Sequence, residues 1–116
     1  MKFLHHPIIL TALFLWAGHA PAQKIYSTDR EWQADIKVYV TTKEYEADLV
    51  VYKAPNDYTS GVNENRGIWY FTEKDYWADK KIYFVEKSYS ADLIVCFTKK
   101  SYNAGWKKAS KKHLLY

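Results

Sequence analysis

The sequence predicts an all-β domain assembled from repeats of one short strand unit, and three observations lead to this prediction. Tyrosines and Ala-Asp pairs recur thirteen residues apart along most of the chain. Within each repeat, apolar and polar residues alternate with the period of two that is typical of a half-buried strand. The segments between the alternating runs are polar, short and free of glycine, which suits tight bends of about four residues.

Composition limits the architecture to one small globular domain. The chain has 116 residues, of which 48% are hydrophobic and 26% are charged, so it is too short for a multidomain enzyme and too apolar for a disordered protein. Cys96 is the only cysteine, which excludes an internal disulfide. No His/Cys spacing typical of zinc occurs, and we expect no cofactor and no metal.

Residues 1–22 have the three parts of a secretory signal peptide. Lys2 precedes an apolar run at 8–16, and the small residues Ala20 and Ala22 suit cleavage before Gln23. The apolar run is shorter than the roughly 20 residues that span a bilayer, although a buried or membrane-anchoring helix is the alternative. We therefore expect an exported protein, periplasmic or extracellular, whose single domain is 23–116.

Six repeat units follow. They run from 26 to 38, 39 to 51, 52 to 69, 70 to 82, 83 to 95, and from 96 onward. The third unit is longer, and the glycines in its segment 61–67 predict a wide loop there. In the unit at 39–51, alternation places Tyr45, Ala47, Leu49 and Val51 on one side of an extended chain. We therefore expect strands of eight to ten residues, with the aromatic at the front of each unit, such as Trp32, Tyr45 or Tyr89, pointing into the core.

The units resemble a known family. The runs Glu-Tyr-Glu-Ala-Asp-Leu-Val-Val-Tyr, Trp-Ala-Asp-Lys-Lys-Ile-Tyr-Phe and Tyr-Ser-Ala-Asp-Leu-Ile-Val, with the closing Asn-Ala-Gly-Trp-Lys, are similar to those of small exported bacterial domains with the septoil, or seven-one, knot. The resemblance extends from Tyr26 to Tyr116. It implies an all-β body in which two arms of the chain wind around each other, and it brings no activity, ligand or functional residue.

The repeated aspartates are the first candidates for chemistry. Asp35, Asp48, Asp79 and Asp92 offer carboxylate oxygens that suit Ca²⁺ or a carboxylate-pair hydrolase. No glycine-rich aspartate loop accompanies them, and each precedes an aliphatic run. We expect them instead to accept structural hydrogen bonds where a strand bends.

No nucleophilic site is indicated. His113 is the only histidine after the signal segment, and Ser110 lies three residues before it on a terminal segment. No Gly-x-Ser-x-Gly turn and no orienting acid accompany this pair. Cys96 replaces a repeating tyrosine and is expected to be a small, buried, unreactive thiol.

The C-terminal segment is basic. Residues 96–116 contain six lysines and no acid. Lys107, Lys108, Lys111 and Lys112, with Trp106 beside them, form a candidate surface for an anionic polymer. The alternative is that Trp106, Leu114 and Leu115 pack back onto the body as a strand or short helix while the lysines face water.

Two further tryptophans are candidates for stacking on sugars. Trp77 lies on the outward side of its strand by parity, and Trp69 follows the wide loop. Packing within the core or across strands is the alternative for both.

These observations favour a non-enzymatic, monomeric structural or binding module of the bacterial envelope. The alternative within that class is a binder of anionic or carbohydrate envelope polymers through Lys107, Lys108, Lys111, Lys112, Trp77 and Trp106. A hydrolase acting on such polymers is the least favoured reading.

Overall fold

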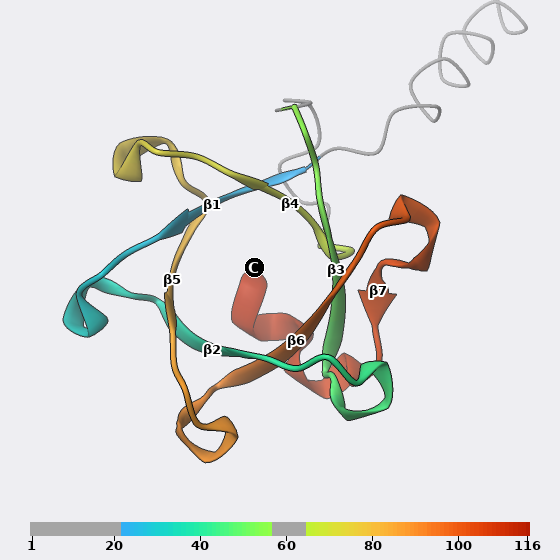
Figure 1. Ribbon diagram of the computed structural model, residues 1–116. Helices are drawn as coiled ribbons and strands as arrows, with labels where there is room; N and C mark the ends of the chain where they lie inside the picture. Colours follow the sequence, from blue (N-terminus) through green and yellow to red (C-terminus); the bar gives the residue numbers. More distant parts are fainter. Residues whose placement is uncertain (1–21, 57–64) are drawn as a thin grey trace, which may run out of the picture.

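The computed structural model describes residues 22–56 and 65–116, and within these ranges six parallel strands form a closed barrel (Figure 1). The order around the barrel is β4-β1-β5-β2-β6-β3, and β3 pairs with β4 to close it. A short strand β7 pairs antiparallel with the beginning of β3. The strands are β1 (Gln23–Ser27), β2 (Ile36–Val40), β3 (Leu49–Lys53), β4 (Ile68–Phe71), β5 (Lys80–Phe84), β6 (Leu93–Thr98) and β7 (Gly105–Trp106).

The chain travels around the barrel and leaves gaps that it fills later. From β1 to β2 and from β2 to β3 it skips one strand position each time. After β4 closes the ring between β3 and β1, β5 enters between β1 and β2, and β6 enters between β2 and β3. This interleaved path is consistent with two arms winding around each other.

The strands are shorter than the sequence pattern predicts. Each barrel strand has four to six residues instead of eight to ten, because the rest of each repeat forms an outward bend that we call an elbow (Figure 1). Every described elbow contains a 3₁₀ helix, by which we name it. These are η2 (Glu31–Gln33), η3 (Glu44–Glu46), η4 (Asp75–Trp77), η5 (Ser88–Ser90) and η6 (Ser101–Asn103).

A threonine begins most elbows by turning the chain away from the strand. The hydroxyl oxygens of Thr28, Thr41 and Thr72 each accept a bond of 3.1 Å from the backbone N–H two residues later. Such local side-chain bonds compete with the strand ladder, so extended structure stops there. The 3₁₀ turn then closes when an alanine N–H donates to the first carbonyl of the turn, as Ala34 does to Glu31 at 3.1 Å.

An aspartate ends four of the five described elbows, η2 to η5, with two bonds to a single residue of a neighbouring strand, whereas Gly105 takes this place after η6. The N–H of Asp48 donates to the Ile94 carbonyl at 2.7 Å, while its Oδ2 accepts from the Ile94 N–H at 2.8 Å. The same pair of bonds recurs at the other three repeats, joining Asp35 to Lys81, Asp79 to Lys24 and Asp92 to Lys37. The prediction of a structural role for this series is confirmed.

The barrel interior is filled by aliphatic side chains and one tryptophan. Leu49 and Val51 of β3 and the equivalent pair Leu93 and Val95 of β6 are fully buried, as the alternation predicts. Trp69 lies among them with no exposed surface. Burial of one such aliphatic side chain stabilises the fold by roughly 1.5–3 kcal/mol.

The prediction that the front aromatics point into the core is wrong. Tyr45 is 78% exposed and Trp32 is 77% exposed, because both lie in 3₁₀ turns and not in strands. Side chains alternate between two faces in a strand, whereas a 3₁₀ turn has three residues per turn. Extending the strand alternation through the turn therefore assigns these rings to the wrong face.

The C-terminal segment closes one end of the barrel. The 3₁₀ helix η7 (Ala109–Leu115) lies over the barrel axis in Figure 1, and Leu115 is buried in the core cluster. The Gln23 amide donates to the Leu115 carbonyl at 2.9 Å, and the Asn65 amide donates to the Lys112 carbonyl at 2.8 Å. Docking of this segment, one of the two alternatives for it, is thereby confirmed.

Some predictions lie outside the described residues. They are the segment 1–21 with its apolar run and residues 61–64 of the wide loop predicted at 61–67. Within 22–56 and 65–116, no helix has both the length and the apolar character needed to span a membrane.

Candidate functional site

The described elbows present a set of equivalent aromatic rings to solvent. Each ring occupies the middle of a 3₁₀ turn, where no strand covers it. The rings belong to Trp32, Tyr45, Tyr76, Tyr89 and Tyr102, which are 74–84% exposed. The elbows project outward from the barrel at separate positions around its circumference (Figure 1).

Basic side chains lie against several of these rings. Arg30 lies 5.9 Å from the centroid of Trp32, and Lys100 lies 5.7 Å from that of Tyr102. In elbow η4 the ammonium of Lys74 is 4.3 Å from the centroid of Trp77, whose ring meets Tyr76 edge-on at 6.2 Å. A flat ring beside a cation combines an apolar stacking surface with attraction for anionic groups.

One open groove lies between two elbows. It has a volume of about 580 Å³ and adjoins η2 and η5. Its lining combines aromatic rings with both signs of charge, from Tyr83, Tyr89, Glu31, Lys37, Glu86 and Lys87. Lys37 and Glu31 form an ion pair of 3.2 Å in its wall. The volume falls in the range of small-ligand sites.

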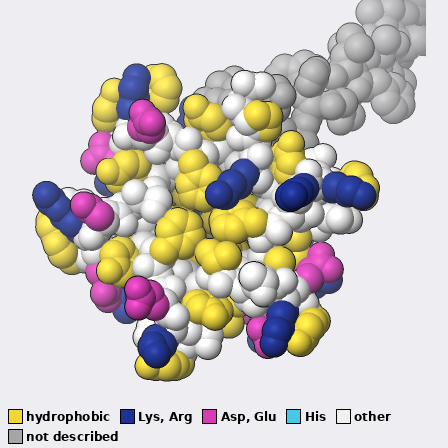
Figure 2. All heavy atoms as spheres, in the orientation of Figure 1, with side chains coloured by type: hydrophobic (Ala, Val, Ile, Leu, Met, Phe, Trp, Pro, Cys, Tyr) yellow, Lys and Arg dark blue, Asp and Glu magenta, His cyan; other side chains and the backbone are white. Residues whose placement is uncertain are grey.

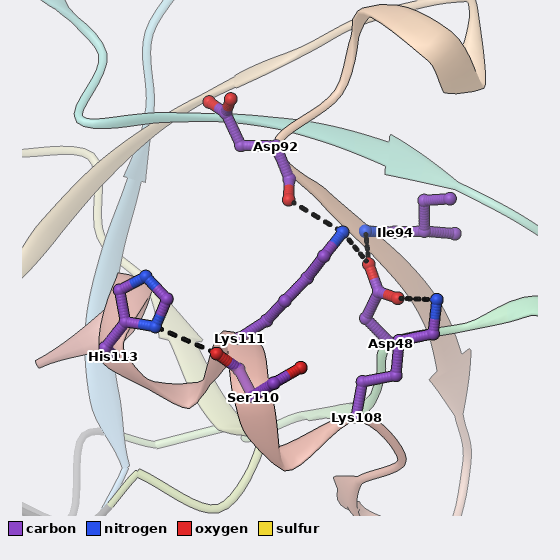
Figure 3. A network of polar contacts seen from close by, with 7 residues as sticks. All are labelled: Asp48, Asp92, Ile94, Lys108, Ser110, Lys111 and His113. Atoms are coloured by element: carbon purple, nitrogen blue, oxygen red, sulfur yellow. Dashed lines mark hydrogen bonds and ion pairs between the residues drawn. The ribbon is translucent and has the colours of Figure 1, made fainter.

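Two of the tail lysines, Lys108 and Lys111, contact the buried carboxylate of Asp48, as Figure 3 shows, although their own side chains are 63% and 35% exposed. The Lys111 ammonium donates to Asp48 Oδ2 at 3.0 Å and to the Asp92 carbonyl at 3.2 Å. Lys108 approaches the other oxygen, Asp48 Oδ1, at 3.6 Å, which is an ion pair but too long for a hydrogen bond. Asp48 itself is 1% exposed. These two lysines therefore anchor η7 to the barrel.

The other predicted tail residues have mixed positions. Lys107 is exposed, although its N–H donates to the Asp48 carbonyl at 2.8 Å. Lys112 is half-buried. Trp106 packs against the core, and its indole N–H points to Asn65 O at 3.0 Å and to Asn65 Oδ1 at 3.1 Å. The tail is a docked segment in which some ammonium groups remain in water.

The structure does not bring Trp77 together with the tail. Trp77 is 51% exposed in elbow η4, which lies across the barrel axis from β7 in Figure 1. Trp69, the other tryptophan considered for sugars, is completely buried and meets Phe71 edge-on at 6.0 Å. Trp69 is therefore a core residue and is unavailable for stacking on a ligand.

The remaining candidates take structural positions. Nδ1 of His113 lies 3.0 Å from the backbone carbonyl of Ser110, so the contact between these residues does not involve the serine hydroxyl (Figure 3). Among residues 22–56 and 65–116, no three His, Cys, Asp or Glu side chains gather in a way that suits a metal ion. Cys96 is 8% exposed, and its burial, followed by the charge of Glu44, raises the pKa of the thiol.

The fold defines a class of repeat-built β domains. Each repeat supplies one strand and one elbow, and the later strands β5 and β6 insert between the earlier strands of the barrel. The chain matches the sequence model of the 7(1) septoil knot domain over residues 22–107. It belongs to that family, as the resemblance of its repeat units implies. Searches of curated proteins and of solved structures each found no match. The helix η7 follows the matched residues.

Sequence reasoning missed the exposed elbow rings as a set. The signal was present, because an aromatic recurs at one position of every repeat beside charged residues such as Glu44 and Glu46. A threonine four residues before four of the five rings was the cue that the strand ends early, as at Thr28, Thr41 and Thr72, whereas Val85 takes this place before Tyr89.

Proposed function

We propose that the protein is an exported, non-enzymatic binding module of the bacterial envelope, and that its elbows bind carbohydrate polymers. The observation that carries this proposal is the array of elbow rings that are 74–84% exposed. The signal peptide proposed for 1–22 and the kinship with exported domains support the location.

The exposed rings have no evident role in folding. The barrel core consists of aliphatic residues and Trp69, and each elbow is held by its own backbone bonds, to which an aspartate adds bonds at η2 to η5. Exposing an aromatic ring to water forgoes the stabilisation that its burial would give. Five repeats that each keep such a ring therefore favour contact with a ligand.

Carbohydrate suits these rings better than a purely anionic ligand does. Flat aromatic surfaces cover the apolar faces of sugar rings, and nearby carboxylates and ammonium groups bond to hydroxyls. The groove between η2 and η5 offers this combination through Tyr89, Glu31 and Lys87. Equivalent weak sites around one domain also gain avidity on a repetitive polymer.

Lysine-based binding through the tail has less support. Lys108 and Lys111 are engaged with Asp48, and Trp106 is bonded to Asn65. Within that alternative, Lys107 and Lys112 remain as the lysines that would contribute salt-dependent binding of an anionic polymer.

The test is calorimetric titration of the 23–116 protein with a panel of envelope polysaccharides at low and high salt. Replacing Tyr89 by Ala and Tyr102 by Ala is expected to weaken binding several-fold, and removing all five rings is expected to abolish it. Ser88→Ala and Ser101→Ala are matched controls, because each changes an exposed residue of the same elbow without removing a ring. Binding that survives loss of all five rings, or that salt alone abolishes, would contradict the proposal.

A further inference from the structure

The end of the barrel opposite η7 carries an apolar surface formed by three phenylalanines. Phe71, Phe84 and Phe97 occupy the same repeat position near the ends of β4, β5 and β6. The Phe71 ring centroid lies 6.5 Å from that of Phe84 and 6.3 Å from that of Phe97. We call this cluster the phenylalanine mouth.

The mouth is open to solvent. Phe84 is 37% exposed, Val40 at the end of β2 is 39% exposed, and Phe71 and Phe97 are half-buried. Figure 2 shows hydrophobic side chains gathered over the barrel axis with basic side chains beside them. At the other end Leu115 of η7 is buried in the core, so the C-terminal segment covers one end of the barrel and the phenylalanine rings cover the other.

A cation lies directly over this apolar floor. The Lys53 ammonium is 4.6 Å from the Phe97 centroid and 5.5 Å from the Phe71 centroid. Within the described part of the chain, the Lys53 ammonium contacts these rings, and no carboxylate lies within ion-pair distance of it. An ammonium held over rings without a counter-charge attracts an anion more strongly than one in bulk water does.

A shallow groove extends the mouth on the side of Lys53. It has a volume of about 420 Å³ and is lined by Tyr52, Lys53, Phe97, Thr98 and Lys99. The Lys53 ammonium lies over the Phe97 ring in this groove, and Lys99 is a second basic residue of its lining. A ligand that fits has one anionic end and one apolar body.

We propose that the phenylalanine mouth binds a single-chain carboxylate amphiphile, of the long-chain fatty acid class. The carboxylate pairs with the Lys53 ammonium, with Lys99 next to it, and the aliphatic chain lies across Phe97, Phe71 and Phe84. The site contains none of the five elbow rings, although Phe84 also lines the groove between η2 and η5, and it does not depend on the function proposed above.

Two other occupants fit less well. A flat anionic bilayer is disfavoured because the periphery of the same face carries acidic as well as basic side chains (Figure 2). A second protein is disfavoured because a mouth of four apolar side chains is much smaller than the roughly 800 Å² that each partner of a stable complex buries.

The test is calorimetric titration of the 23–116 protein with dodecanoate below its aggregation concentration, with ring-proton NMR of the phenylalanines. We expect saturable binding of one dodecanoate and shifts of the Phe84 and Phe97 signals. Lys53→Gln is expected to weaken binding about tenfold, the factor that corresponds to losing about 1.4 kcal/mol. Lys43→Gln, which removes an exposed lysine of an elbow, is the matched control and is expected to bind as the parent does.

Two probes separate the contributions. Acetate has the charge without the chain, and octaethylene glycol monododecyl ether has the chain without the charge and without a sugar, so each is expected to bind at least tenfold more weakly than dodecanoate. Equal affinity for this ether and dodecanoate would overturn the proposal, as would unchanged binding by Lys53→Gln. A dimer in light scattering that Phe84→Ser converts to a monomer would also overturn it, because the mouth would then be covered by a second copy of the chain.

Discussion

Asp48 and Lys111, which are 63 residues apart in the sequence, meet in an ion pair of 3.0 Å between Oδ2 and Nζ. Asp48 is 1% exposed, whereas the Lys111 side chain is 35% exposed. The carboxylate also accepts the Ile94 N–H at 2.8 Å, as the equivalent aspartates do on their neighbouring strands. One member of a repeated series thus holds both a barrel strand and the C-terminal segment.

Lys111→Met is therefore expected to destabilise the protein. The change leaves a buried carboxylate with the more distant Lys108 ammonium, and we expect a loss of about 1–3 kcal/mol in the free energy of unfolding. Urea denaturation measures this loss. Lys107→Met is the matched control, since its exposed side chain makes no such pair, and its effect is expected to stay within about 0.5 kcal/mol. Equal losses from the two variants would show that the ion pair does not hold the segment.

Leu49 and Tyr45 belong to one repeat but differ completely in burial. Leu49 has no exposed surface, whereas Tyr45 is 78% exposed. Leu49→Ala is expected to lower the free energy of unfolding by about 2–5 kcal/mol. Tyr45→Ala is expected to change it by less than about 0.5 kcal/mol. Urea denaturation measures both changes. A large loss of unfolding free energy in Tyr45→Ala would mean that the Tyr45 ring packs against the barrel in solution.

This pair of residues shows how far the sequence predicts the fold. The thirteen-residue period and the family follow from comparing one repeat with the next. The all-β class and the buried pairs, such as Leu49 and Val51, follow from the alternation within each repeat. The aspartate role was also predictable, because a carboxylate before an aliphatic run favours local hydrogen bonds.

The elbows and the mouth were not predictable in the same way. Alternation continues from Tyr45 to Leu49 in the sequence, although a 3₁₀ turn separates the two residues in space. The mouth requires β4, β5 and β6 to alternate with β1, β2 and β3 around a closed barrel, so that Phe71 meets both Phe84 and Phe97. Strand order of this kind depends on contacts between distant repeats, which periodicity within one repeat does not contain.

Gly67 occupies a position that no other residue fits. Its φ is +85°, and a Cβ there would lie 2.5 Å from the Val50 carbonyl oxygen. The Gly67 carbonyl also accepts the Tyr52 N–H at 2.8 Å, which helps β3 meet β4. Gly67→Ala is therefore expected to cost at least about 1–3 kcal/mol from backbone strain, with the steric clash in addition. A melting temperature equal to that of the parent protein would contradict this placement of the segment before β4.

Cys96 is expected to react slowly with alkylating reagents. Burial in β6 raises the pKa of its thiol above the ordinary value of 9.0, and the nearby Glu44 charge raises it further. Since the thiolate is the reactive form, iodoacetamide should label the native protein several-fold more slowly than the urea-unfolded protein at pH 8.

The folded state favours the protonated thiol of Cys96, so the contribution of this group to stability is complete below pH 9.0 and is lost as the pH rises through the higher folded-state pKa. Cys96→Ala is the control, because the stability difference between parent and variant should be constant below pH 9.0 and shift against the parent above it. Equal labelling rates for native and unfolded protein would show that the thiol is accessible and unperturbed.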